Sequence, residues 1–257
     1  MLLRLRPDMV EGYFGLGDSY GQLCSAFYTR DLVRRKHYAD LAIGTLKQAI
    51  SLKPVYVEAY VSLGSTYWNM ERVAEAIETF KLAINIKPDY AEAYFQLGNA
   101  YYYPASRQRY KISDEQLRAA YSADLFNAIT AFEQAIQLQA DTAKRGGIYN
   151  NLSGAYQLLG QYQKAIEVSN KAIRTTQSRD GHLQLYNAYG NSNHLVEGVE
   201  AFKELIRIKP DDDNAHYYLG LLHLDLGDKR LALEEYKILK NLRSEFWAKS
   251  LLDNIFK

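Results

Sequence analysis

A period of thirty-four residues constrains the fold of this chain more than any other feature of its sequence. The stretch VEAYVSLGSTYWN returns as AEAYFQLGNAYYY, and the segments before each stretch match with the same shift. The matching pairs are Tyr60 and Tyr94, Leu63 and Leu97, Gly64 and Gly98, Tyr67 and Tyr101, Ala49 and Ala83, and Pro54 and Pro88. A fixed period of this length is typical of arrays in which each unit packs only against its neighbours.

The residue types within one period predict two helices that approach closely. Tyr94, Leu97, Gly98 and Tyr101 recur at i, i+3, i+4 and i+7, which is one apolar stripe of a helix. In AEAIETFKLAINIKP, the residues that share one helical face are Ala76, Phe80 and Ala83. Small residues in both helices allow close contact, and the proline that closes the period cannot continue a helix.

This pattern resembles the tetratricopeptide repeat, in which an aromatic, Leu-Gly and Tyr lie on a first helix and Ala, Phe, Ala and Pro on a second. The resemblance covers nearly the whole chain, most similar to bacterial arrays, and implies an all-α, right-handed helical solenoid with about six repeats and a C-terminal capping helix. The expected boundaries within one array over 1–257 are 8–54, 55–88, 89–140, 146–178, 179–210 and 211–243 for the repeats, and 244–257 for the cap. Pro7 falls where an earlier repeat would close, so we expect the chain to be a fragment of a longer protein.

Repeats one and three depart from the template at the turn between their two helices, by about thirteen and about eighteen residues. In repeat one the apolar spacing continues on both sides of the turn, which predicts two lengthened helices. In repeat three, Pro104 is expected to end the first helix just after Tyr103. The segment SDEQ then predicts a capping box, with Ser113 as N-cap and Gln116 reaching back, before a long second helix.

Both insertions are basic, and they are expected to lie on one edge of the array. The residues of this possible basic edge are Arg34, Arg35, Lys36, Arg107, Arg109 and Lys111. One interpretation is a solvated charged edge. The other is a docking edge for an acidic partner or, less favoured, for RNA.

The remaining chemistry of the chain argues against catalysis. Lys and Arg number 31 and Asp and Glu 30, so the net charge of +1 favours neither a nucleic-acid binder nor a membrane-surface binder. One cysteine excludes an internal disulfide and a cysteine-based zinc site, and no window is long and apolar enough to span a membrane. We interpret the histidines at repeat-core positions as structural. His216 and His223 share a helix face, as two metal ligands could, but no third ligand is evident in the sequence. We expect no enzyme activity, no cofactor, no metal and no small-molecule substrate.

On each first helix, one stripe of residues packs against the rest of the repeat. We expect the adjacent stripe to face the inner, concave side of the array, which is the surface that binds peptides in the tetratricopeptide family. It is rich in amides and aromatics, which suit an extended segment held by its backbone. Its expected peptide-groove residues are Ser65, Trp68, Asn69, Phe95, Gln96, Asn99, Tyr102, Tyr103, Asn150, Asn151, Gln157, Gln184, Asn187, Asn191 and Tyr217. The stripe is similar to the asparagine-lined arrays of the family and lacks the cations of its carboxylate-clamp members, although its amides could simply be solvated.

The sequence therefore predicts a scaffold that binds an extended protein or peptide segment in this groove. A regulatory or targeting domain of a larger enzyme or assembly complex is the alternative, and an RNA-binding repeat is less favoured. Self-association through an exposed terminal repeat is a further expectation. The compartment is open, with the cytoplasm favoured, because a signal peptide would precede this segment.

Overall fold

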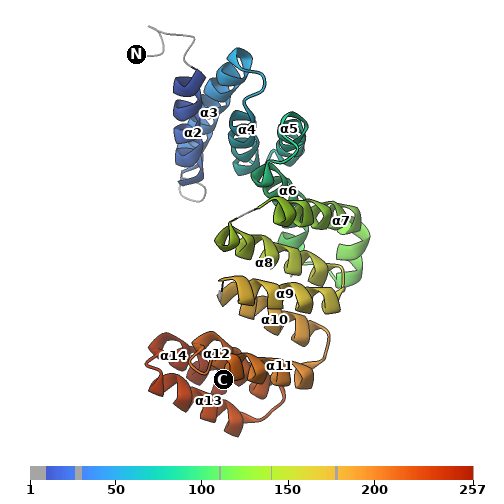
Figure 1. Ribbon diagram of the computed structural model, residues 1–257, viewed down its shortest axis with the longest axis vertical. Helices are drawn as coiled ribbons and strands as arrows, with labels where there is room; N and C mark the ends of the chain where they lie inside the picture. The colour runs from blue at the N-terminus through green and yellow to red at the C-terminus, as the bar shows by residue number, and fades with distance from the viewer. Residues whose placement is uncertain (1–9, 27–30, 110, 140, 177–178, 257) are drawn as a thin grey trace. The chain divides into compact units, whose positions relative to one another are not determined.

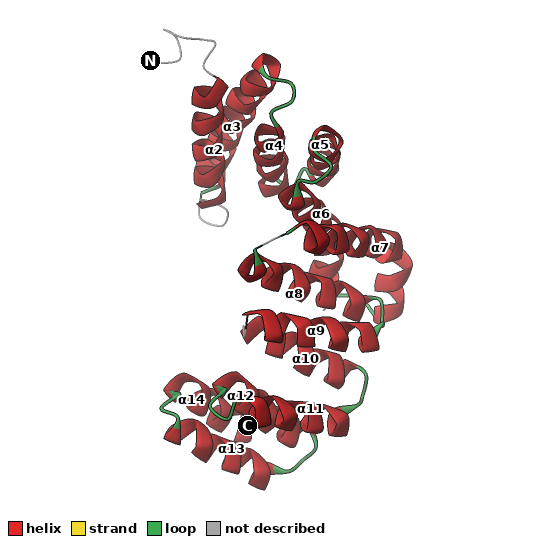
Figure 2. Ribbon diagram, viewed as in Figure 1, coloured by secondary structure: helices red, strands yellow, loops and turns green. Residues whose placement is uncertain are grey.

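The computed structural model describes residues 10–26, 31–109, 111–139, 141–176 and 179–256 of the chain. Every regular element within these ranges is an α-helix (Figures 1 and 2). The chain divides into two compact units, unit 1 over Met1–Ala140 and unit 2 over Asp141–Lys257. The all-α fold with consecutive packed helices is therefore confirmed, whereas the exact repeat boundaries stay a prediction.

Unit 1 contains three consecutive helix pairs, each packed most closely within itself. The helices are α2 (Val10–Ala26), α3 (Leu32–Leu52), α4 (Val57–Asn69), α5 (Val73–Ile86), α6 (Ala91–Gln108) and α7 (Asp114–Leu138). Unit 2 contains three further pairs and a final helix. They are α8 (Thr142–Leu158), α9 (Tyr162–Thr176), α10 (Arg179–Asn191), α11 (Leu195–Ile208), α12 (Asp213–Asp225), α13 (Lys229–Asn241) and α14 (Glu245–Ile255).

In the second and third pairs, the core forms where a glycine of the first helix faces a phenylalanine of the second. A Cβ added at Gly64 would lie 2.5 Å from the ring of Phe80, and one added at Gly98 would lie 2.5 Å from Phe132. Both rings are buried. The repeating glycine is therefore required by the close approach of the two helices, as the sequence pattern predicts.

The pairs without an insertion share one turn geometry. In each, the carbonyl at the second aromatic position of the first helix accepts a hydrogen bond from the backbone N–H five residues later. These bonds are Arg72 to Tyr67, Gln161 to Tyr156, His194 to Tyr189 and Asp228 to His223. The turns contain a residue in the left-handed region, such as Gly160 with φ of 74° and Gly227 with φ of 83°. This is the αL type of helix ending, which glycine adopts without steric cost.

The third pair contains both a confirmed prediction and a wrong one. Ser113 and Gln116 form the predicted capping box, with hydrogen bonds of 3.2 Å and 3.1 Å in the two directions. Pro104, in contrast, does not end its helix, because α6 continues to Gln108. Proline costs one backbone hydrogen bond and crowds the carbonyl four residues earlier. The continued turns fully bury Ala105, and such apolar burial offsets part of that cost.

Two expectations concern residues outside the described ranges. They are the upstream repeat inferred from Pro7, and the centre of the first insertion at residues 27–30. The helices that flank this insertion, α2 and α3, are longer than their counterparts α4 and α5, as the spacing predicts. Among the described residues, no helix combines the length and the apolar character that crossing a bilayer requires.

Candidate binding surface

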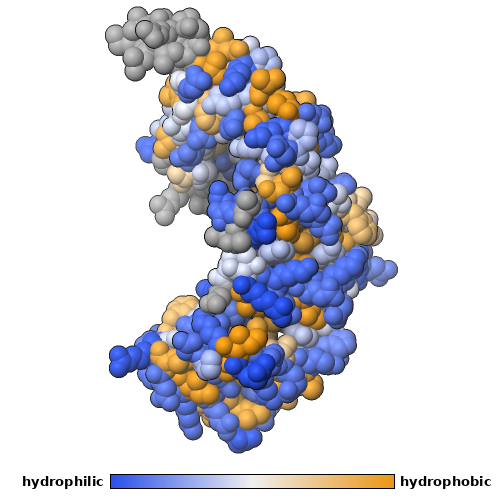
Figure 3. All heavy atoms as spheres, in the orientation of Figure 1, coloured by the Kyte–Doolittle hydropathy of each residue, from blue (hydrophilic) through white to orange (hydrophobic). Residues whose placement is uncertain are grey.

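The first helices of the three pairs in unit 1 form a shared surface. They are α2, α4 and α6, and α4 packs against both of the others. We call this surface the first-helix face of unit 1, and its members are Asp18, Gln22, Ser62, Ser65, Trp68, Asn69, Phe95, Gln96, Asn99, Tyr102 and Tyr103. The visible sides of both units carry interspersed hydrophilic and hydrophobic residues, so hydropathy alone does not single out this face (Figure 3).

A polar hollow of about 220 Å³ lies between α2 and α4. The Asp18 carboxylate accepts a 2.8 Å hydrogen bond from the Ser62 hydroxyl and another of 2.8 Å from the Gln22 amide. The predicted groove residues Ser65 and Asn69 line the same hollow. Among the described residues that line it there are hydroxyl, amide and carboxylate groups and no Lys or Arg, so these groups can pair with both the N–H and the C=O of a peptide backbone.

Two members of this hollow, Asp18 and Gln22, are missing from the sequence prediction. They lie forty-seven residues before Ser65 and Asn69, which is one period plus the first insertion. Applying the groove positions of the second repeat to the first one would have found both residues.

Aromatic side chains cover the neighbouring part of the face, between α4 and α6. The rings of Trp68 and Tyr103 are 5.8 Å apart, and those of Tyr103 and Tyr102 are 5.4 Å apart. Tyr102 in turn contacts the buried ring of Phe132 at 6.2 Å. Tyr103 is 37% exposed, so the cluster joins the core of the third pair to the surface.

A second hollow of about 240 Å³ lies beside this aromatic cluster. Its lining comes from the end of α4, the start of α5, and the inserted parts of α6 and α7. The residues are Trp68, Glu71, Val73, Pro104, Arg107, Gln108 and Tyr121. The two hollows together flank the C-terminal end of α4, where Asn69 faces one and Trp68 faces the other.

The remaining predicted groove residues of unit 1 differ in their exposure. Phe95 and Gln96 are half-buried, with Phe95 6.2 Å from the ring of Phe132 and Gln96 hydrogen-bonded to Glu92 at 2.6 Å. Asn99 is only 9% exposed. It therefore contributes to the packing between helices more than to an open surface.

In unit 2 the predicted amides bond to one another. The Gln157 amide donates to the side-chain oxygen of Gln184 at 2.8 Å and accepts from Asn191 at 3.3 Å. Gln157 is 4% exposed, so its prediction as an open groove residue is wrong. The amide joins α8 to α10, because a buried amide is stable only when its donors and acceptors are satisfied.

Tyr217 is likewise wrong as an open groove residue. Its ring lies 4.4 Å from that of Trp247 in α14, and its hydroxyl lies 3.1 Å from the Ser250 hydroxyl. The capping helix thus covers this position. The other predicted amides are more accessible: Asn191 is exposed, and the half-buried ones are Asn150, Asn151, Gln184 and Asn187.

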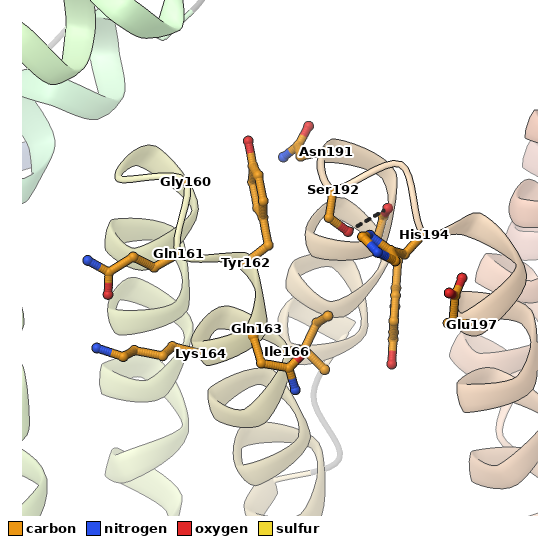
Figure 4. Close-up of a pocket in the computed structure, with 11 residues that line it drawn as sticks. Gly160, Gln161, Tyr162, Gln163, Lys164, Ile166, Asn191, Ser192, His194 and Glu197 are labelled. Carbon is orange, nitrogen blue, oxygen red and sulfur yellow. Dashed lines mark hydrogen bonds between the residues drawn. The ribbon is translucent and has the colours of Figure 1, made fainter.

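A hollow of about 800 Å³ in unit 2 lies at the turns that follow α8 and α10 (Figure 4). In the figure Gln161 and Lys164 point to one side, and Glu197 comes from the helix on the other side. Ser192 is held by a 3.1 Å hydrogen bond to the carbonyl of Tyr189. Asn191 is the one predicted groove residue in this lining.

The residues of the predicted basic edge differ in their exposure and in their ionic partners. Arg35 is only 8% exposed and donates to the backbone carbonyl of Asn69, so its prediction as an exposed basic residue is wrong. Arg34 pairs with Asp31 at 3.3 Å, and Arg107 with Glu71 at 3.9 Å. Lys36 and Lys111 are exposed and Arg109 is half-buried, and whether they bind a partner stays a prediction.

Three histidines of unit 2, His182, His216 and His223, are buried at the repeat-core positions that the sequence predicts. His216 has acceptors at both ring nitrogens, the Glu235 carboxylate at 2.6 Å and the Pro210 carbonyl at 3.0 Å. Only the imidazolium form donates to both. Burial opposes that charge, but Glu235, Pro210 and Asp212 together raise the pKa of His216 above 6.5. Within the described residues, no three His, Cys, Asp or Glu side chains are grouped to hold a metal ion.

We expect the free energy of unfolding to fall as pH rises above 6.5, because His216 then loses the proton that its raised pKa retains in the fold. Burial lowers the pKa of His223, so this residue makes the free energy of unfolding fall when pH decreases below 6.5. Glu235→Gln should remove the fall, whereas Glu234→Gln, at a 51% exposed side chain, should keep it. Urea unfolding across this pH range measures the free energy of unfolding of both variants. If its pH dependence is the same for Glu235→Gln and for the unaltered chain, the contact between Glu235 and His216 is not the cause of the fall.

Known proteins support the same family as the repeat spacing. Family models of the tetratricopeptide repeat match residues 70–103, 146–178 and 183–243. No curated protein matches the sequence. The chain is similar to the solved structure of MamA, with 25% identity and a TM-score of 0.56 over 77% of this chain and 90% of that one.

Two other solved structures are similar in fold. PilF from Pseudomonas aeruginosa has 16% identity and a TM-score of 0.55, over 95% of this chain and 99% of that one. YrrB, described as a TPR protein with an unusual peptide-binding site, has 16% identity and a TM-score of 0.50, over 81% of this chain and 97% of that one. The likeness to PilF and YrrB shows the fold alone. The three family-model matches, together with the period and the helix pairs, identify the chain as a tetratricopeptide repeat protein.

Proposed function

We propose that this chain is an interaction scaffold that binds an extended segment of a partner protein across the first-helix face of unit 1. Membership of the tetratricopeptide family supports the general part of this proposal, since these repeats are interaction modules. The likeness to YrrB extends to the fold alone, at 16% identity. The specific part therefore rests on the two hollows of unit 1.

The observation that carries the proposal is the pair of hollows on either side of the α4 end. They meet at the end of α4, where the consecutive residues Trp68 and Asn69 line one hollow each, and we propose that one extended segment crosses both. The polar hollow offers hydroxyl and amide groups to the partner's backbone, and the aromatic side offers a large apolar surface at little entropic cost. The described residues that line the polar hollow include the Asp18 carboxylate and no Lys or Arg, which favours an uncharged stretch over an acidic chain end.

Peptide selection tests this proposal directly. Short peptides from a random library are selected on the immobilised full chain, and their affinities are measured by calorimetry. We expect Trp68→Ala to weaken binding by about tenfold or more, because truncating a buried aromatic contact typically costs over 1 kcal/mol. Asn69→Leu keeps the side chain's size but removes the amide, and should also weaken binding.

Phe126→Ala is the matched control for the loss of an exposed ring. Phe126 is 53% exposed on the second helix α7, away from the proposed surface. Its replacement should leave the affinity unchanged. Peptides that bind all three variants as tightly as the unaltered chain would show that another surface is used, and the proposal would then be abandoned.

A further inference from the structure

The hollow beside the aromatic cluster is a product of the insertion in the third repeat. α4 ends at Asn69, and the residue one period later is Tyr103, but α6 continues to Gln108. Pro104, Arg107 and Gln108 therefore have no counterpart in the second repeat. Tyr121 comes from the added turns at the start of α7. The inserted residues thus form the hollow with Trp68, Glu71 and Val73 of the preceding pair.

Four of the residues that line this hollow carry aromatic or apolar side chains, namely Trp68, Val73, Pro104 and Tyr121, and the other three are polar. The Trp68 indole also contacts the ring of Tyr103 at 5.8 Å. A rigid aromatic wall of this kind suits a compact, ring-shaped or branched side chain.

The charges at this hollow disfavour a charged occupant. Glu71 and Arg107 both line it and lie 3.9 Å apart, with side chains 60% and 51% exposed. These two opposite charges offset each other, so a charged side chain would lose hydration in the hollow without a net electrostatic gain. An uncharged side chain has no such cost.

The hydrogen-bonding groups narrow the choice further. The Trp68 indole and the Arg107 guanidinium are donors only, whereas Gln108 and Tyr121 can either donate or accept. Glu71 is the one acceptor-only side chain in the lining, and it already faces Arg107. Four of the lining side chains can therefore donate hydrogen bonds to the carbonyl groups of a bound backbone.

We infer that this hollow receives a proline side chain from a proline-containing extended segment, which crosses the first-helix face of unit 1. This inference rests on the proposed function and names the chemistry of the segment. Proline has a compact apolar ring, no backbone N–H and an extended conformation with solvent-facing carbonyls. Aromatic-lined surfaces are a recurrent way of binding such segments.

Trp68 itself can report the binding, because the chain has two tryptophans. Trp247→Phe leaves Trp68 as the sole indole, and retained helical content is checked first by circular dichroism. A synthetic polyproline peptide is then titrated into this full-length variant, with a glycine–serine peptide of equal length as the comparison. We expect a saturable change of Trp68 fluorescence with polyproline and none with the glycine–serine peptide.

Three further variants locate the binding. Tyr121→Ala removes one wall and should weaken polyproline binding by about tenfold. Val73→Phe narrows the hollow and should do the same, which keeps the test decisive if Tyr121→Ala does not fold. Phe126→Ala changes an exposed ring on the same helix as Tyr121 and should leave the affinity unchanged.

Two results would overturn the inference: no Trp68 response to polyproline, or a response that neither Tyr121→Ala nor Val73→Phe reduces. The proposed function would survive either result if library-selected peptides without proline still bound in a manner that depends on Trp68 and Asn69. Failure of that library experiment would instead refute the proposed function itself, so the two failures are distinguishable.

Discussion

Replacing Phe132 with Ala is expected to lower the free energy of unfolding by about 3–5 kcal/mol. Its ring is fully buried in the third helix pair. It lies 6.2 Å from the rings of both Phe95 and Tyr102, and it fills the space opposite Gly98. Removing the ring leaves a cavity at the centre of a pair that packs mainly within itself, and urea unfolding followed by circular dichroism measures the loss.

A double-mutant cycle tests the reason for this loss. Gly98→Ala alone should destabilise by about 1–3 kcal/mol, because its new Cβ would lie 2.5 Å from the Phe132 ring. In the Phe132→Ala background that ring is absent, so the same change should stabilise by up to about 1 kcal/mol through helix propensity. Gly44→Ala is the control, since a Cβ at Gly44 meets no atom within 4 Å. Equal effects of Gly98→Ala in both backgrounds would contradict the close-approach explanation.

Replacing Trp247 with Ala is expected to lower the free energy of unfolding by about 3–5 kcal/mol. This residue of the capping helix is 8% exposed, with its ring 4.4 Å from that of Tyr217 and the Arg179 guanidinium 4.6 Å from its centroid. A terminal helix of this kind covers an apolar face that a further repeat would otherwise bury.

The neighbouring residue provides a matched control for the cap. Phe246 is 66% exposed, so Phe246→Ala should change stability by about 0.5 kcal/mol or less. Thermal or urea unfolding compares the two variants. Similar losses for Trp247→Ala and Phe246→Ala, or no loss for either, would show that α14 does not stabilise unit 2.

The sequence predicts the core of this fold well because the core depends on local spacing. The helix α7 is an example, because Leu117, Leu125 and Phe132 recur at intervals of eight and seven residues, which places them on one helical face, and all three are buried. The capping box at Ser113 is likewise a local pattern, with its partner three residues away. Features whose physics lies within one helix or one pair can be read from the chain directly.

The binding surface is less predictable because it depends on how consecutive helices cover one another. Gln157 and Tyr217 occupy the predicted groove stripe, but the helices packed against them bury both. Arg35 shows a different error, since it precedes the buried residues Ala39 and Ala42 by four and seven positions. Its spacing therefore indicates the buried stripe of α3, although its charge favours the surface.

Pro104 shows the limit of a local rule. A proline disfavours the helical interior, yet α6 continues through it. The continued helix is stabilised by the burial of Ala105 and by contacts of the added turns with the preceding pair. The dipeptide Tyr-Pro by itself reveals neither. The same added turns form the second hollow, so the wrong helix boundary also hid the site.

The central claim is that a partner segment binds on the first-helix face of unit 1, and the two indole N–H signals of the chain test it most directly. Trp68 lines the second hollow of this face, whereas Trp247 is a buried residue of the capping helix α14 in unit 2. In a nitrogen–proton NMR titration with a library-selected peptide, the Trp68 indole signal should shift progressively and that of Trp247 should stay in place. A peptide that binds without shifting the Trp68 signal would contradict the claim.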